Sequence, residues 1–248
     1  KGWDTDMHID QSEFDLMWFD SIPVQKRKKG NNATSQKYYY KDIITAFDIE
    51  TTYIKEIDNS VMYIWQWAFG EDTVVIGRTW EEFTDLQNRI RLALPEGYRL
   101  VVYVHNLSYD ISYLYPYLLD LPDNDDPYQG IIEDNNKFLT FVRGSFEFRC
   151  SYRLSGLSLE KWSANNKAYK KKIGLYDYDK VIYPDQGLTD QEQKYDEFDV
   201  LAMKECLAKQ MSYFGDDLTT IPLTKTGYIR RTLRRSCRNS KYYRKKYF

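Results

Sequence analysis

Two acidic side chains stand two residues apart where an apolar segment of the chain ends. Asp48 and Glu50 close residues 43–50, a short and largely apolar run that is typical of a buried strand. Because side chains alternate along a strand, we expect both carboxylates on one face of it. The same spacing recurs at Asp190 and Glu192, but there it begins a polar helical turn, where acids simply favour the helix dipole.

Two further acids end two other patterns. Asp110 closes an N-x3-D sequence that begins at Asn106, directly after an apolar strand pattern at residues 100–104. Asp199 closes a Y-x3-D sequence that begins at Tyr195, inside a long helical pattern where positions i and i+4 share a face. The first pattern also has an ordinary explanation, in which Asn106 caps a helix and Asp110 favours its dipole.

The four acids together indicate one kind of chemistry. Clustered carboxylates repel one another unless cations join them. Oxygen ligands of this kind suit hard divalent cations such as Mg²⁺. Two such ions activate a water and stabilise the leaving oxygen of a phosphodiester, and the Tyr195 hydroxyl is placed to orient that water. We therefore expect two divalent cations, Mg²⁺ or Mn²⁺, as cofactors.

The elements expected to position these acids form a mixed sheet covered by helices. The order is three strands, helix, strand, helix, hairpin, helix. Capping boxes begin two of the helices at Thr79 and Thr189. The expected strands are 43–50, 61–69, 73–77 and 100–104, the hairpin is 138–142 with 146–150, and the helices are 80–94, 109–119 and 190–214.

Composition narrows the function classes. No apolar run approaches a membrane span and the start lacks a signal-peptide pattern, so we expect no membrane contact. Three separated Cys and two His suit neither a disulfide framework nor a zinc site, which favours a reducing cytoplasm. The net charge of −2 hides an asymmetry: residues 225–248 hold ten basic residues and no acidic one, against 25 basic and 37 acidic in the remainder.

Three of these segments resemble the exonuclease motifs of family B DNA polymerases and occur in the same order. They are Phe47-Asp48-Ile49-Glu50-Thr51, Tyr103-Val104-His105-Asn106-Leu107-Ser108-Tyr109-Asp110 and Tyr195-x3-Asp199. The H-N-L-x-[FY]-D form is most similar to protein-primed phage and viral polymerases. The resemblance implies a DEDDy 3′→5′ proofreading exonuclease with an RNase H-like α/β fold, a mixed five-stranded sheet flanked by helices with an inserted β-hairpin.

The resemblance also implies roles for individual residues. Asp48, Glu50 and Asp199 would hold the metals, Asp110 would support one of them through water, and Tyr195 would position the attacking water. Positions that match contacts to the DNA strand in that subgroup are Thr51, His105, Asn106, Tyr109, Tyr113, Ser158, Leu159, Lys172 (or Lys171) and Tyr178. Ser158 and Leu159 equally fit an ordinary helix N-terminus. Tyr109, Tyr113 and Tyr178 are the aromatics expected to stack on bases.

The polymerase motifs of that family are absent from the chain. We therefore expect an N-terminal extension and linker at 1–40, the exonuclease domain at 41–226, and a basic segment at 227–248 that leads toward a polymerase domain. Two roles fit the basic segment equally well: it binds DNA that leaves the site, or it is a helix that docks on the polymerase domain. The implied partners are a single-stranded DNA 3′ end, the polymerase domain and a priming terminal protein, in the host cytoplasm if the source is viral.

Two other functions fit the same residues. One is a binding module that holds single-stranded DNA or a priming protein without cleaving it, although the four acids argue against a dead site. The other is a free-standing DEDDy nuclease that acts on RNA.

Overall fold

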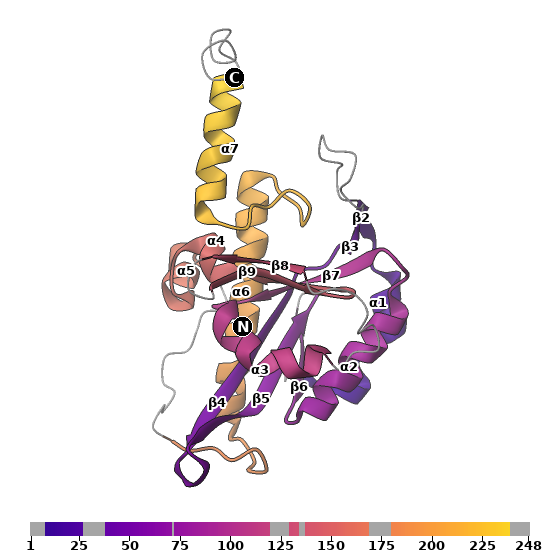
Figure 1. Ribbon diagram of the computed structural model, residues 1–248, viewed down its shortest axis with the longest axis vertical. Coiled ribbons are helices and arrows are strands. Elements are labelled where there is room, and N and C mark those ends of the chain that lie inside the picture. The colour runs from indigo at the N-terminus through magenta and orange to yellow at the C-terminus, as the bar shows by residue number, and fades with distance from the viewer. Residues whose placement is uncertain are drawn as a thin grey trace.

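A computed structural model of the protein describes residues 8–26, 38–70, 72–119, 129–133, 137–168 and 180–238 (Figure 1). These residues build one mixed sheet with helices on both faces. The centre of the sheet has five strands in the order β6-β5-β4-β7-β10. Their bounds are Thr73–Gly77, Asn59–Phe69, Thr45–Ile54, Tyr98–Val104 and Phe146–Cys150.

The direction of these five strands follows from how they are connected. The first three in sequence, β4, β5 and β6, are antiparallel neighbours joined by short turns. After α2 (Trp80–Ala93) the chain returns in β7, parallel to β4, and β10 lies parallel to β7. This is the mixed five-stranded sheet that the strand and helix order predicts, and the hairpin expected around Gly144 is present as β9 (Lys137–Arg143) and β10.

The sheet extends beyond these five strands on both sides. β8 (Gln129–Glu133) pairs with β9, while β1 (His8–Asp10) lies parallel to β6. β3 (Tyr39–Lys41) pairs with β7, and β2 (Val24–Lys26) pairs with β3. Residues 8–26, to which no element was assigned from their sequence, thus form short edge strands together with η1 (Gln11–Glu13) and α1 (Leu16–Ser21).

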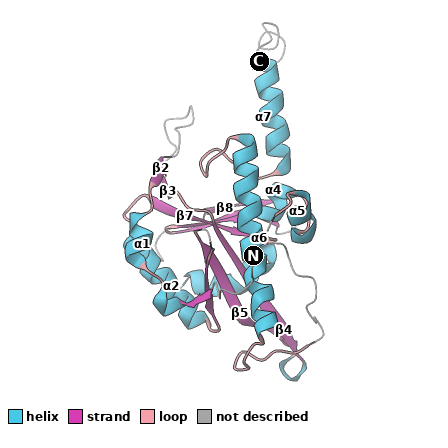
Figure 2. Cartoon of the chain, turned by 180° about the vertical axis from the view of Figure 1, so that it is seen from behind, coloured by secondary structure: helices cyan, strands magenta, loops and turns pink. Residues whose placement is uncertain are grey.

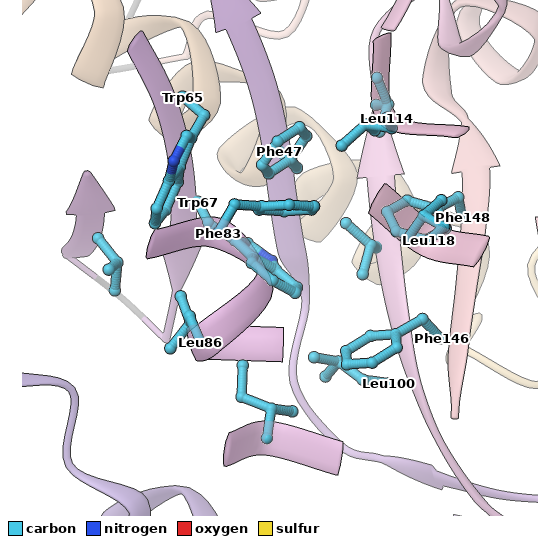
Figure 3. Packing of buried hydrophobic residues seen from close by; sticks show 14 of the residues in the cluster. Phe47, Trp65, Trp67, Phe83, Leu86, Leu100, Leu114, Leu118, Phe146 and Phe148 are labelled. Carbon is cyan, nitrogen blue, oxygen red and sulfur yellow. The ribbon is translucent and has the colours of Figure 1, made fainter. Parts of the chain in front are cut away.

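One face of the sheet is covered by α1, α2 and α3 (Leu107–Leu119) over an aromatic core. Phe47 and Trp67 from the sheet meet Phe83 of α2, with ring centroids 5.1 and 6.0 Å from that of Phe83 (Figure 3). Trp65, Trp67 and Phe69 of β5 are fully buried in this core.

The other face is covered mainly by α6 (Asp190–Phe214), which runs across β4 and β5 (Figure 2). The short helices α4 (Ser151–Ser155) and α5 (Leu159–Asn165) lie beside it, and α7 (Lys225–Arg238) follows near its C-terminal end. No helix in the described part of the chain is long and apolar enough to span a bilayer.

The expected helix ends are confirmed by their hydrogen bonds. Thr79 and Thr189 each form a capping box, with Glu82 and Glu192 respectively, and Gly215 ends α6 in the left-handed conformation. The main difference lies in β4, which continues four residues past Glu50 and pairs with β5 through a bulge after Glu50, before the short η2 (Lys55–Ile57). This extension mixes exposed and buried side chains, so no apolar run marks it in the sequence.

Candidate metal centre

Three of the predicted acids meet where α6 crosses β4. The side chains of Asp48 and Glu50 come from β4 and that of Asp199 from α6, and each offers a carboxylate oxygen within 4.8 Å of the other two. Asp199 is buried, whereas Asp48 and Glu50 are half-buried, so the cluster opens to solvent on the strand side. The structure therefore brings together the strand pair and the helical acid that the sequence places 149 residues apart or more.

Small residues explain how α6 comes this close to the sheet. Ala46 lies two residues before Asp48 in β4 and therefore on the same face, and Ala68 is its partner across β5. Both alanines are fully buried in one cluster with Val200 and Met203 of α6. Their short side chains let the helix lie directly over β4, which carries Asp199 toward Asp48.

Asp110 lies beside the cluster but outside the group of three. It sits in the first turn of α3, and its carboxyl group is 2% exposed. Burial, and secondarily the charge of Asp48, raise the pKa of Asp110 well above its usual value, while a hydrogen bond from the Ile49 backbone partly opposes this. Asp110 is thus near enough to Asp48 for the two charges to interact, and its role beside a metal ion stays a prediction.

A fifth acid, which the motif analysis passed over, lies in the same region. Asp196 stands three residues before Asp199 on α6 and is completely buried, with no hydrogen-bond partner for either carboxylate oxygen in the described part of the chain. Burial raises the pKa of Asp196 to about 9, with Asp199 and Asp48 as the next causes. Its spacing of i and i+3 from Asp199 was the available signal, since such residues share a helix face.

A buried amide accompanies these acids. Gln66 lies directly opposite Asp48 in the β4–β5 register, so the two side chains are on the same face of the sheet. It is fully buried, and neither atom of its amide has a hydrogen-bond partner among the described residues. The face that meets α6 therefore holds buried polar groups that no other residue in the described ranges hydrogen-bonds.

The donors present fit hard divalent cations. The three clustered ligands are all carboxylates, with no thiol or imidazole among them, which is the donor set that Mg²⁺ and Mn²⁺ prefer. Buried carboxyl groups without partners are costly, and Asp110 keeps one oxygen, Oδ1, without a partner in the described structure. Bound cations would offset the repulsion among Asp48, Glu50 and Asp199.

Tyr195 lies one turn before Asp199 on α6 and is buried to 3% exposure. Helical spacing places it on the same side of the helix as Asp199, as the Y-x3-D pattern predicts. Its role in holding a water stays a prediction.

The residues expected to hold a nucleotide begin next to the acids. The hydroxyl oxygens of Thr51 and Tyr109 lie 2.5 Å apart, and the ring centroid of Tyr109 is 5.4 Å from that of Tyr113. Tyr109 is 45% exposed, so one side of its ring is available for stacking on a base. Burial of its hydroxyl raises the pKa of Tyr109 to about 12, which keeps this group a hydrogen-bond donor.

His105 and Asn106 form the turn between β7 and α3. The His105 ring stacks on Trp162 with centroids 6.3 Å apart, and its Nδ1 lies 2.9 Å from the Ser151 hydroxyl. Asn106 is exposed and adopts a left-handed backbone with φ of 70°. The turn therefore exposes Asn106 next to the part of β4 that carries Asp48, since Val104 pairs with Phe47. Asn tolerates this left-handed conformation better than most residues do.

The remaining predicted contacts are less informative. Ser158 caps α5 by accepting a hydrogen bond from the Lys161 backbone, and Leu159 is buried in the α6-side core. This is the ordinary helix start that the sequence left open as an alternative, so contact of Ser158 and Leu159 with DNA stays a prediction. Lys172 and Tyr178 lie outside the described residues.

Comparisons with known proteins agree with the fold. No protein-family model matches the sequence, and no curated protein sequence matches it. Solved structures of Phi29 DNA polymerase do match: the complex with single-stranded DNA has a TM-score of 0.58 at 18% identity over 72% of this chain and 33% of that chain. The post-translocation complex with primer-template DNA has a TM-score of 0.58 at 18% identity over 71% of this chain and 32% of that chain.

The chain thus spans about a third of the length of the polymerase that it matches. At 18% identity the match establishes similarity of the fold alone. The protein has the RNase H-like exonuclease fold, which confirms the fold class expected from the three motifs.

Proposed function

We propose that this chain is a metal-dependent 3′→5′ exonuclease that removes mononucleotides from single-stranded or frayed DNA 3′ ends. The observation that supports this best is the cluster of Asp48, Glu50 and Asp199, whose oxygens lie within 4.8 Å of one another. It occurs on a fold shared with a DNA polymerase that has been solved with single-stranded DNA.

Asp48, Glu50 and Asp199 would hold two divalent cations, and Asp110 would act on one of them through water. When bound, the cations supply an activated water and stabilise charge on the leaving oxygen of the phosphodiester. The protein would contribute the rest: the Tyr195 hydroxyl would orient the attacking water, and the three carboxylates would keep the cations in place.

The exposed residues next to the acids would hold the substrate. Tyr109 offers a ring face to a base, and its hydroxyl group, together with that of Thr51, offers polar contacts to the terminal nucleotide. His105 and Asn106 lie on the turn immediately before α3, the helix that carries Tyr109, where the DNA strand would continue. Stacking holds a base without regard to its identity, as removal of any nucleotide requires.

The three motifs and the fold shared with Phi29 DNA polymerase support a wider setting for this activity. The chain would be the proofreading part of a protein-primed family B DNA polymerase, working beside a polymerase domain and a priming terminal protein. Its expected location is the cytoplasm of the cell in which that DNA is copied.

A 5′-labelled single-stranded oligonucleotide with Mg²⁺ or Mn²⁺ tests the activity. We expect a ladder of products shortened from the 3′ end, which EDTA abolishes and which a blocked 3′ terminus prevents. Asp48→Asn and Asp199→Asn should each remove at least about a hundredfold of the rate, since each deletes a metal ligand. Asp85→Asn, an exposed acid on α2, is the matched control and should leave the rate unchanged.

The same assay decides among the other functions. Unchanged activity in either ligand variant would overturn the assignment of the site. Binding of the oligonucleotide without metal-stimulated cleavage would favour a binding module, and faster cleavage of an RNA oligonucleotide of the same sequence would favour an RNA nuclease.

A further inference from the structure

Helix α7 projects from the body of the protein beyond the end of α6 (Figure 1). Contacts near its base join it to the body: the Tyr228 ring stacks on Phe214 with centroids 4.2 Å apart, and Arg231 pairs with both carboxylate oxygens of Asp216 and donates to the Thr220 carbonyl oxygen. From Thr232 to Ser236 every side chain is exposed. The second half of α7 is therefore helical without packing against the described part of the chain.

The charges on α7 oppose its own stability. Arg230, Arg234 and Arg235 are exposed, and none of them pairs with a carboxylate in the residues that the structure describes. Arg230 and Arg234 stand at i and i+4, as do Arg231 and Arg235, and like charges at that spacing destabilise a helix. The helix contains no acidic residue, so no ion pair within α7 offsets this repulsion.

A short helix with these properties needs a partner to hold it. An isolated helix of 14 residues is marginal in water, and this one also contains Gly227. An anionic chain laid along the three free arginines would remove the repulsion and add hydrogen bonds, because the planar guanidinium group binds phosphate in a bidentate way.

We infer that α7 is a second nucleic-acid contact, which binds the phosphate backbone of the strand whose 3′ end lies at the metal centre. The inference rests on the proposed function for the identity of that strand. Asp199 and Phe214 are separated by about 22 Å along α6, so α7 begins well away from the carboxylates. A strand of a few nucleotides occupies the metal centre alone, whereas a longer strand also reaches α7.

A membrane surface is the competing partner of a basic helix. Interfacial helices bury a broad apolar face. On α7 the large exposed apolar side chains are Ile229 and Leu233, 55% and 58% exposed, and its aromatic residue Tyr228 is buried against the body. Three free arginines against two apolar side chains favour a phosphate backbone over a lipid surface.

The test uses the whole protein in EDTA, where DNA is bound but not cleaved. Fluorescence anisotropy of a labelled 20-nucleotide single strand compares the wild type with the triple variant Arg230→Glu, Arg234→Glu, Arg235→Glu. We expect at least tenfold weaker binding and a salt dependence whose log–log slope is smaller by about 2, from three lost phosphate contacts. The triple replacement by Lys, which keeps the charges, is the matched control and should bind within a few fold of the wild type.

The inference would be overturned if the Glu variant and the wild type bound the 20-mer with equal affinity, and the more so if Ile229→Ser with Leu233→Ser weakened binding instead. The partner would be a membrane instead if the wild-type protein bound phosphatidylserine vesicles while the Glu variant and the wild type bound DNA equally well. Cleavage of a four-nucleotide strand with Mn²⁺ should be the same in the Glu variant and the wild type. Failure of the wild type to cleave that short strand would count against the proposed function, whereas the anisotropy result would still decide the role of α7.

Discussion

The hydroxyl oxygens of Thr51 and Tyr109 lie 2.5 Å apart and join β4 to α3 at the edge of the acidic cluster. Thr51 directly follows Glu50 at the bulge in β4, and Tyr109 directly precedes Asp110. One hydrogen bond thus connects the two segments that carry three of the acids.

A double-mutant cycle measures that connection. Thr51→Val and Tyr109→Phe each remove one hydroxyl group and leave the shape nearly unchanged, and each should lower the free energy of unfolding by about 1 kcal/mol or less. The double variant should cost less than the sum of the two, because the second change removes a bond that the first has already broken. Urea denaturation of the four proteins checks this, and strictly additive effects would show that the two hydroxyl groups do not interact.

The buried carboxyl group of Asp196 makes the protein sensitive to alkaline conditions when metal is absent. Its pKa is about 9 in the folded protein against 3.8 in the unfolded chain, so the folded state binds more protons between these values and stability falls as pH rises through that range. Asp196→Asn removes this titration. In EDTA its melting temperature should exceed that of the wild type by a margin that grows from pH 5 to pH 9.

Glu192→Gln is a useful comparison for Asp196→Asn, because Glu192 lies on the same helix and its pKa is lowered rather than raised. Relative to the wild type, the melting temperature of Glu192→Gln should therefore show no gain as the pH rises from 5 to 9. A constant margin for Asp196→Asn over this range would contradict the burial of an ionisable Asp196.

Asp110→Asn should separate activity from stability. Burial and Asp48 favour the neutral form of Asp110, so an amide of the same shape is tolerated in the folded protein without metal. The melting temperature in EDTA should therefore be equal to or above that of the wild type at pH 8, while the metal-stimulated cleavage rate should fall at least about tenfold. A variant with full cleavage activity would remove Asp110 from the proposed site.

Asn106 is expected to matter for two reasons that substitution can distinguish. Its φ of 70° is costly for residues with a Cβ but not for Gly, so Asn106→Ala should be less stable than Asn106→Gly by about 1 kcal/mol. Both variants lack the side-chain amide and should show a similarly raised KM for a single-stranded oligonucleotide. Equal stability of the two variants in urea would show that the backbone conformation of this turn is not strained.

Glu147 holds a buried charge network on the α6 side of β10. It accepts hydrogen bonds from Tyr40 at 2.8 Å and from Arg149 Nε at 2.9 Å, and it also pairs with Arg99. The two arginines and Tyr40 outweigh burial and lower the pKa of Glu147, so its stabilising effect is present near neutral pH and is lost as pH falls through that lowered pKa. Glu147→Gln should destabilise the protein by about 3 kcal/mol at pH 7 and by less in strong acid, as measured by urea denaturation.

Much of the fold was predictable because its signals are local. The capping boxes at Thr79 and Thr189 depend on residues three positions apart, and the apolar runs of β5 and β7 reflect strands buried on both faces. The short strands β1 and β3 were not predictable in this way. Each is three residues long and joins the sheet by pairing with a strand more than fifty residues away, β6 for β1 and β7 for β3. No local sequence pattern therefore predicts it.

By itself the sequence determined which side chains have the chemistry, since Asp48, Glu50, Asp110 and Asp199 are recognised by type, spacing and order along the chain. It also determined that Asp48 and Glu50 share a face, because strand alternation is a local property. Only the tertiary structure decided that Asp199 offers a carboxylate oxygen within 4.8 Å of theirs and that Asp196 is buried with no hydrogen-bond partner among the residues described. Those facts depend on how closely α6 packs on Ala46 and Ala68, a contact between residues far apart in sequence whose distance no spacing rule encodes.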